Sequence, residues 1–149
     1  MFEQILVVCM GNICRSPVGE KLLQHHFPEK NITSAGLVTE RSRLVDKPAD
    51  DMMIKIASQH GLNLSAHRAK QLTRALCHKA DLILVMEKAH IELVHQICPL
   101  SQGKVMLFGH GLTASKEIPD PYKKSQEMFE YAYQMLDSAA YQWKKCYRI

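Results

Sequence analysis

The chain contains 149 residues, of which 46% are hydrophobic and 23% charged, and these values suit a single globular domain over residues 1–149. No apolar run approaches the roughly 18 residues of a membrane span, and residues 1–4 lack a signal peptide's basic start, so we expect a cytoplasmic protein without direct membrane insertion. The formal net charge of +4 favours anionic ligands but is far from a dense Lys/Arg stripe, so we predict no nucleic-acid binding.

The first predicted strand leads into a loop and a helix. The continuous apolar run at residues 5–8 is typical of a strand buried on both faces of a parallel sheet. A helix is expected over 18–27, with Ser16 as its N-cap and Pro17 in its first position. Residues 8–17 therefore join a strand end to a helix N-terminus, where converging N–H groups and the helix dipole bind anions.

The middle of the chain alternates between strands, loops and helices. The pattern predicts a strand at 31–35 stopped by Gly36, a polar surface loop at 37–47, and a helix at 48–60 ended by Gly61. Ser65 and Thr73 are candidate caps for two short helical pieces within 62–77. A second continuously apolar strand is predicted at 81–86, followed by a helix at 87–97.

The last elements complete an α/β order. A strand is predicted at 104–108, a long loop at 109–124 and an amphipathic helix at 126–147. Alternating strands and helices imply a three-layer α/β fold, with a four-stranded parallel sheet and helices on both faces. Because such sheets bind ligands at the carboxyl ends of their strands, the loops after the first and fourth strands can reach one site.

The ends of the first loop suggest nucleophilic chemistry on a phosphate. Cys9 opens the loop, and beside loop N–H groups, a helix N-terminus and a cation we expect it to be a thiolate. Arg15 closes the loop with a planar fork of donors that can hold two phosphate oxygens. Ser16 can offer its hydroxyl to the Cys9 sulfur, while Gly11 and Asn12 tolerate the positive φ of a tight loop. Attack by Cys9 would form a phosphocysteine.

A late acidic residue can supply proton transfer. Asp120 lies in the predicted loop before the last helix, where Pro121 stiffens the backbone. We expect Asp120 to protonate the leaving oxygen and then to accept a proton from the hydrolytic water, which predicts a bell-shaped pH profile. We expect no metal and no cofactor. His90 and His95 lack metal-ligand spacing, and the histidines are predicted to be solvated.

The segment Cys9-Met10-Gly11-Asn12-Ile13-Cys14-Arg15-Ser16-Pro17 resembles the signature of the low-molecular-weight protein tyrosine phosphatases. That family also places an Asp-Pro pair late in the chain, as in Asp120-Pro121-Tyr122, and the resemblance covers nearly the whole sequence. It implies a protein tyrosine phosphatase with Cys9 as nucleophile, Arg15 as phosphate ligand and Asp120 as acid and then base. Asn12 and Ser16 would support the loop. The remaining expected phosphate- and substrate-binding residues are Met10, Gly11, Ile13, Cys14 and Tyr122.

The expected walls of the site, Tyr122 and residues 37–46, resemble one branch of this family. The first wall lacks an aromatic residue, and Lys123 stands where better-known eukaryotic members have a second tyrosine. With the patterns at 103–109 and 117–125, these features resemble bacterial members linked to capsule and exopolysaccharide production. The resemblance implies a phosphotyrosine protein as partner, the tyrosine-rich tail of a membrane tyrosine autokinase. We expect the enzyme to be a monomer.

Other functions use a similar cysteine loop. Thioredoxin-coupled arsenate reductases need two further redox cysteines close together on a mobile segment, whereas Cys77 and Cys98 are 21 residues apart. A cysteine phosphocarrier has no need of Arg15 or of a late acid, because its intermediate must survive until transfer. A phosphotyrosine-binding module would not need all three catalytic groups. Cys14 either traps an oxidised Cys9 as a disulfide or is a packed small side chain.

Overall fold

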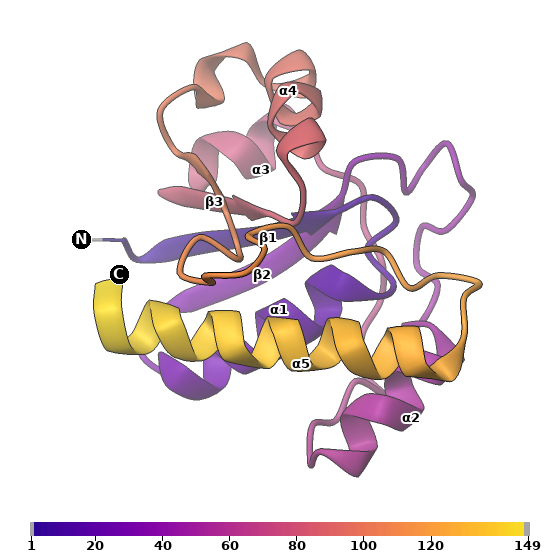
Figure 1. Cartoon of the computed structure of the whole chain (residues 1–149). Helices are drawn as coiled ribbons and strands as arrows, with labels where there is room; N and C mark the ends of the chain where they lie inside the picture. Colours follow the sequence, from indigo (N-terminus) through magenta and orange to yellow (C-terminus); the bar gives the residue numbers. More distant parts are fainter. Residues whose placement is uncertain (1, 148–149) are drawn as a thin grey trace.

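A parallel sheet forms the centre of the computed structural model, which describes residues 2–147. Its strand order is β2-β1-β3-β4. The strands are β1 (Gln4–Cys9), β2 (Asn31–Gly36), β3 (Leu82–Val85) and β4 (Val105–Leu107). The α-helices are α1 (Arg15–His26), α2 (Asp51–Gln59), α3 (Arg74–Lys79), α4 (Lys88–Ile97) and α5 (Gln126–Gln142). Helices α1, α2 and α5 cover one face of the sheet and α3 and α4 the other, so the predicted three-layer α/β fold is confirmed (Figure 1).

Strand β1 shows why its sequence is continuously apolar. Ile5 and Val7 point into the hydrophobic cluster that includes residues of α1, α2 and α5, whereas Leu6 and Val8 join the cluster under α3 and α4. All four are almost completely buried. Successive side chains of a strand point to opposite faces, so a central strand covered on both sides has no position for a polar residue.

Two helix starts differ from the prediction. Helix α1 begins at Arg15 with Cys14 in the N-cap position and no side-chain cap, so the prediction of Ser16 as N-cap is wrong. The Ser16 hydroxyl instead contacts side chains of the preceding loop. Helix α2 begins at Asp51 rather than at residue 48, because the Asp50 carboxylate accepts hydrogen bonds from the first helical N–H groups and caps it there.

The segment between α2 and β3 contains one helix instead of two. Gly61 follows α2 with φ 79°, as expected of a glycine helix stop. Thr73 caps α3 by accepting a hydrogen bond from Leu76 N at 3.2 Å. Ser65 starts only a turn, so the helical piece predicted there is wrong. The backbone at 67–70 forms neither helix nor strand and is joined to the loop after β2, because Asp46 N donates to Ala69 O and Ala69 N to Lys47 O, each at 2.8 Å.

The last described residues form one long helical segment packed along α1. Helix α5 is capped by Ser125, and the segment Trp143–Tyr147 continues it as a π-helix. Trp143 anchors this end, because its indole N–H donates to the Phe108 carbonyl at 2.7 Å. Within residues 2–147 no helix is long and apolar enough to cross a membrane.

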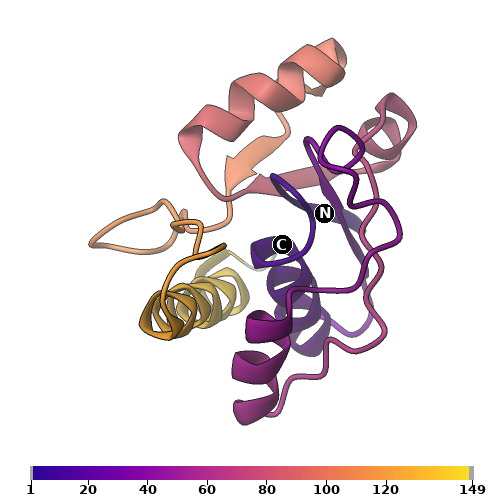
Figure 2. The same ribbon diagram turned by 90° about the vertical axis from the view of Figure 1, so that its right-hand side faces the viewer.

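Three loops gather at the carboxyl ends of the strands. Figure 2 faces that end, with the loop after β1 between the loop after β2 and the segment that leads into α5. Hydrogen bonds hold them together: Leu37 N donates to Cys9 O and Val38 N to Met10 O, each at 2.9 Å. The segment that leads into α5 is joined to the residue after β3, because Ile118 N donates to Met86 O, also at 2.9 Å. The expected meeting of distant loops at one edge of the sheet is therefore confirmed.

Candidate active site

A pocket of about 180 Å³ opens at the carboxyl end of β1. Its lining comes from the loop after β1, the loop after β2 and the loop before α5. The lining residues are Cys9, Met10, Gly11, Ile13, Cys14, Arg15, Val38, Ser42, Leu44, Asp120 and Tyr122. The three residues predicted to be catalytic thus meet in one cavity, although Asp120 is 105 positions after Arg15 in the sequence.

Asn12 lies behind the pocket and holds the loop in shape. It is fully buried and has φ 61°, the positive value expected for a tight loop. Its Oδ1 accepts from Lys70 N at 2.9 Å, and its Nδ2 donates to Ser16 Oγ at 2.7 Å and Ser34 Oγ at 3.0 Å. Its carbonyl oxygen lies 2.6 Å from His67 Nε2. Burial lowers the pKa of His67, which favours a neutral ring that donates from Nε2 to this carbonyl.

The same network extends to Cys9. Cys9 is 3% exposed, and its sulfur lies 3.0 Å from Ser16 Oγ. Since Ser16 Oγ already accepts from Asn12 Nδ2, its single hydrogen is available to the sulfur. Ser16 and Asn12 do not line the pocket and support it from behind.

Arg15 is a buried cation with one side fixed. The residue is 1% exposed, and its Nη1 donates to Glu87 Oε2 at 2.5 Å and to the Ile118 carbonyl at 2.7 Å. Its Nη2 lies 3.8 Å from Asp120 Oδ2. A buried charge is tolerated only when it is paired and hydrogen-bonded, and these partners meet that need. The guanidinium therefore keeps one orientation in the pocket wall.

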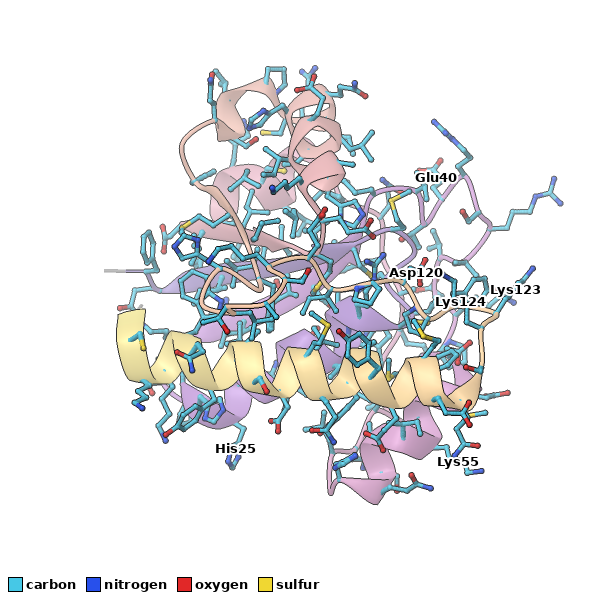
Figure 3. The ribbon with its side chains drawn as sticks, viewed as in Figure 1. His25, Glu40, Lys55, Asp120, Lys123 and Lys124 are labelled. Atoms are coloured by element: carbon cyan, nitrogen blue, oxygen red, sulfur yellow. The ribbon has the colours of Figure 1, made fainter. Side chains whose placement is uncertain are left out.

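Asp120 is oriented by its own turn. Its Oδ1 accepts from Tyr122 N at 3.0 Å, which leaves Oδ2 directed towards the Arg15 guanidinium. Its side chain is 45% exposed, and Figure 3 shows it at the end of the molecule where the loops meet. The carboxyl group therefore combines a fixed direction with access to water.

The pocket walls are aliphatic on one side and aromatic on the other. Val38, Ser42 and Leu44 line the pocket from the loop after β2, and Tyr122 lines it from the segment that leads into α5, on the other side of the loop after β1 (Figure 2). Both expected walls therefore line the pocket. Thr39 does not line it, but its hydroxyl donates to Gly11 O at 3.0 Å and joins this wall to the active-site loop.

Glu87 and His90 are site residues that the sequence reading did not identify. Glu87 binds Arg15, and His90 Nε2 lies 3.5 Å from the same Glu87 oxygen. His90 is only 3% exposed, so the prediction that it is solvated is wrong. Burial, followed by the positive charge of Arg15, lowers its pKa. Position was the available signal, because Glu87 directly follows the predicted strand 81–86 at the ligand-binding edge of the sheet.

Cys14 lines the pocket beside Cys9 but differs from it in surroundings. Burial, reinforced by the negative charge of Asp50, raises the pKa of the Cys14 thiol. Cys14 is therefore a neutral thiol at physiological pH. Because the thiolate is the reactive form, this environment disfavours Cys14 as a nucleophile.

The whole chain is similar to proteins of one family. The family model described as low molecular weight phosphotyrosine protein phosphatase matches residues 4–147. The low molecular weight protein-tyrosine-phosphatase Wzb of Escherichia coli K12 is 52% identical over 143 residues, which cover 96% of this chain and 94% of that protein. The probable low molecular weight protein-tyrosine-phosphatase AmsI of Erwinia amylovora is 51% identical, with 96% of each chain covered.

Solved structures agree with this relationship. Vibrio vulnificus Wzb in complex with benzylphosphonate matches with a TM-score of 0.94 and 51% identity, over 97% of this chain and 99% of that one. The expected enzyme class, a protein tyrosine phosphatase, is confirmed by these relatives. The chain belongs to the low molecular weight phosphotyrosine protein phosphatase family.

Proposed function

We propose that this protein hydrolyses phosphotyrosine in proteins through a phosphocysteine intermediate on Cys9. The observation that carries the proposal is the convergence of Cys9, Arg15 and Asp120 on one pocket of about 180 Å³. A nucleophile, an anion ligand and an acid are the three groups that transfer of a phosphoryl group to cysteine requires. Vibrio vulnificus Wzb binds benzylphosphonate, an aromatic ring joined to a phosphonate, which supports an aryl phosphate as ligand.

In the first step the Cys9 thiolate attacks phosphorus and the bond to the tyrosine oxygen breaks. Arg15 and the loop N–H groups hold the three equatorial oxygens as their charge develops. Asp120, protonated in the complex, gives its proton to the departing phenolate oxygen. The products are the dephosphorylated tyrosine and phosphocysteine. The Ser16 hydrogen bond stabilises the attacking thiolate before this step.

In the second step water hydrolyses the phosphocysteine. The Asp120 carboxylate accepts a proton from the attacking water, and the phosphorus–sulfur bond breaks to restore the Cys9 thiolate. Inorganic phosphate leaves, and Asp120 has regained its proton. The 45% exposure of Asp120 is consistent with this role, because water must reach the carboxylate.

The pocket walls support a preference for phosphotyrosine over phosphoserine. Val38 and Leu44 on one side and Tyr122 on the other offer apolar surface to a phenyl ring. Phosphoserine lacks this ring and has a shorter reach, so it gains neither the wall contacts nor full access to the 3% exposed Cys9.

The proposed substrate protein is the tyrosine-rich tail of a bacterial membrane tyrosine autokinase in capsule or exopolysaccharide production. Support comes from identities of 52% and 51% to Wzb and AmsI and from the matching bacterial wall pattern. We propose a monomeric enzyme of one domain, and the match of one family model to residues 4–147 supports the single domain. A cytoplasmic location fits the five cysteines, which are all free thiols.

The two alternatives have less support. Cys77 and Cys98 are both buried in the cluster under α3 and α4, whereas Cys9 belongs to the cluster on the other face of the sheet. Redox relay from Cys9 to this pair, as in an arsenate reductase, has no path along the pocket. A phosphocarrier would not gain from an acid positioned to hydrolyse its intermediate.

The test measures hydrolysis of p-nitrophenyl phosphate, a phosphotyrosine peptide and a matched phosphoserine peptide between pH 5 and 8. We expect EDTA-resistant hydrolysis of the first two substrates by the wild type. Cys9→Ser should abolish turnover, and Asp120→Asn should reduce kcat by about 10²- to 10⁴-fold, the usual worth of general acid–base catalysis. Cys146→Ser, a matched change at an exposed cysteine, should leave activity unchanged.

Rapid-quench detection of phosphate on Cys9 distinguishes the mechanisms. A phosphoenzyme that forms and decays to inorganic phosphate supports the hydrolase. A phosphoenzyme that stays stable for hours in the wild type, with no turnover, would contradict the proposal and favour the carrier. Full activity of Cys9→Ser would contradict it as well.

A further inference from the structure

Four cations lie next to residues that line the mouth of the pocket. Arg41 and Arg43 flank Ser42 in the loop after β2, while Lys123 and Lys124 follow Tyr122 on the opposite wall. All four are exposed. We call these residues, Arg41, Arg43, Lys123 and Lys124, the basic rim. It places positive charge on both sides of the opening.

The lysine side of the rim is held against the pocket wall. Lys123 has φ 62°, and Lys124 N donates to Pro121 O at 2.8 Å, so the backbone turns tightly here. This turn brings Lys123 Nζ to 5.5 Å from the centre of the Tyr122 ring, a cation–π contact. The ring lines the pocket, so the ammonium group lies close to its mouth. Figure 3 shows Lys123 and Lys124 at the same end of the molecule as Asp120.

The arginine side of the rim stands on an anchored loop. Arg43 N donates to Glu40 O at 3.0 Å and Leu44 N to Thr39 O at 2.9 Å. The Gln71 side chain accepts from Glu40 N at 2.8 Å and ties this loop to the neighbouring segment. The two arginines are therefore presented from fixed backbone positions, which reduces the entropy lost when a partner binds.

No residue in 2–147 forms an ion pair with any member of the basic rim. In the wall loop 37–47 the cations Arg41, Arg43 and Lys47 outnumber Glu40 and Asp46, and in the segment 120–125 Lys123 and Lys124 outnumber Asp120. The resulting field extends about 8 Å at physiological ionic strength, far enough to act without direct contact. A peptide whose phosphotyrosine occupies the pocket places its neighbouring residues, about 3.3 Å apart when extended, across this field.

We propose that the basic rim selects phosphotyrosines flanked by acidic residues, so that the substrate class is an acidic phosphotyrosine segment. This inference rests on the proposed phosphatase function and adds the sequence context of its substrate. Carboxylates on either side of the phosphotyrosine face Arg41 and Arg43 on one wall and Lys123 and Lys124 on the other. Complementary charge chiefly raises the association rate, so the selection acts on kcat/KM more than on kcat.

The experiment compares three phosphotyrosine peptides of one length, with Asp/Glu, Asn/Gln or Lys at the flanking positions. For the wild type at 50 mM NaCl we expect kcat/KM to be about 3- to 10-fold higher for the acidic than for the neutral peptide. The lysine peptide should be the poorest substrate. At 300 mM NaCl the difference should shrink, because salt screens exposed charges.

Matched variants locate the effect. Arg41→Gln/Arg43→Gln and Lys123→Gln/Lys124→Gln should each reduce the acidic preference, and the quadruple variant should abolish it. Lys55→Gln/Lys79→Gln removes the same charge from exposed positions on α2 and α3, and should keep the wild-type preference. Figure 3 shows Lys55 on α2, apart from Lys123 and Lys124.

Three outcomes overturn the inference. Equal kcat/KM for the acidic and neutral peptides at 50 mM NaCl would do so, as would an acidic preference that survives in the quadruple variant. If the wild type still hydrolyses p-nitrophenyl phosphate, each of these two results overturns only this inference and leaves the proposed phosphatase function intact. A wild type that hydrolyses neither p-nitrophenyl phosphate nor any peptide overturns the proposed function and this inference together.

Discussion

One residue, Asn12, holds the active-site loop through both its side chain and its backbone. Asn12 makes four hydrogen bonds, through Oδ1, twice through Nδ2 and through its carbonyl oxygen, to four separate positions of the chain. It also has φ 61°, which asparagine tolerates better than most residues. A buried amide with these partners is costly to replace, because each lost partner would leave a polar group unsatisfied. Loop shape and the hydrogen bond to Cys9 therefore depend on the same residue.

Arg15 depends on a different set of partners, and Glu87 is the one that substitution can test. In Glu87→Ala the guanidinium loses its 2.5 Å partner and keeps the Ile118 carbonyl. We expect Arg15 to move within the pocket and kcat/KM for p-nitrophenyl phosphate to fall by about 10- to 100-fold, since displacements near 1 Å have effects of this size. Competitive inhibition by inorganic phosphate should weaken in parallel.

Glu92→Ala provides the control for that substitution. It removes an exposed carboxylate from α4, the helix that Glu87 directly precedes, at a position that does not line the pocket. It should leave both kcat/KM and phosphate inhibition as in the wild type. Wild-type phosphate inhibition in Glu87→Ala would show that the Ile118 carbonyl and Asp120 are sufficient to orient Arg15.

Among the elements, the end of β2 supports the active-site loop by close contact. Gly36 pairs with Cys9 in the sheet and lies directly against the backbone of the loop. A Cβ at Gly36 would be 2.8 Å from Met10 O and 2.9 Å from Asn12 N, as well as 2.0 Å from Thr39 Oγ1. Backbone atoms cannot rotate away as a side-chain end can, so this position requires glycine for space.

Gly36→Ala should therefore reduce both stability and phosphate binding. We expect the free energy of unfolding to fall by about 1–3 kcal/mol, the usual cost of overpacking. The inhibition constant of inorganic phosphate should rise, because Asn12 N and its neighbours are displaced. Urea denaturation and inhibition of p-nitrophenyl phosphate hydrolysis measure the two effects.

A second variant separates the contacts of Gly36. Gly36→Ala/Thr39→Ala removes the closest contact, that to Thr39 Oγ1, but leaves both backbone contacts. It should recover only part of the lost stability. Unchanged stability and unchanged phosphate inhibition in Gly36→Ala would show that the loop can move aside without cost.

For the molecule as a whole, two buried histidines, His67 and His90, and the half-buried His26 link stability to pH. Burial is the largest cause that lowers the pKa of His26, His67 and His90 from the ordinary value of 6.5. The unfolded chain therefore binds protons at these sites at higher pH than the folded chain. Between the lowered values and 6.5, stability rises with pH. Their contribution is complete above pH 6.5 and is lost as the pH falls.

We accordingly expect the free energy of unfolding of the wild type to decrease from pH 7.5 to pH 5.5. Urea denaturation at several pH values measures the change. The triple variant His26→Gln/His67→Gln/His90→Gln should show a flatter dependence, whatever its absolute stability. A wild-type stability that rises or stays constant as the pH falls through this window would contradict the assignment.

The sequence by itself determined much of the fold and the reacting groups. Short continuous apolar runs, glycine stops and the Thr73 cap are local signals. The apolar patterns placed all four strands, α1, α4 and α5 close to their observed positions, and the Thr73 cap marked the start of α3. The spacing of Cys9 and Arg15 between a strand and a helix, together with a late Asp-Pro, indicated residues that line one pocket. Local backbone preference and side-chain chemistry are legible because they need no distant partner.

Only the tertiary structure decided which side chains surround those groups. Ser16 is not a cap because the buried Cys9 and Asn12 offer its hydroxyl other partners. Arg15 binds Glu87 and Ile118, which are 72 and 103 positions away, and the buried His90 lies against the same Glu87 oxygen. Such partners result from packing between elements, and no local pattern encodes them. The orientation of the catalytic groups is therefore a property of the assembled fold.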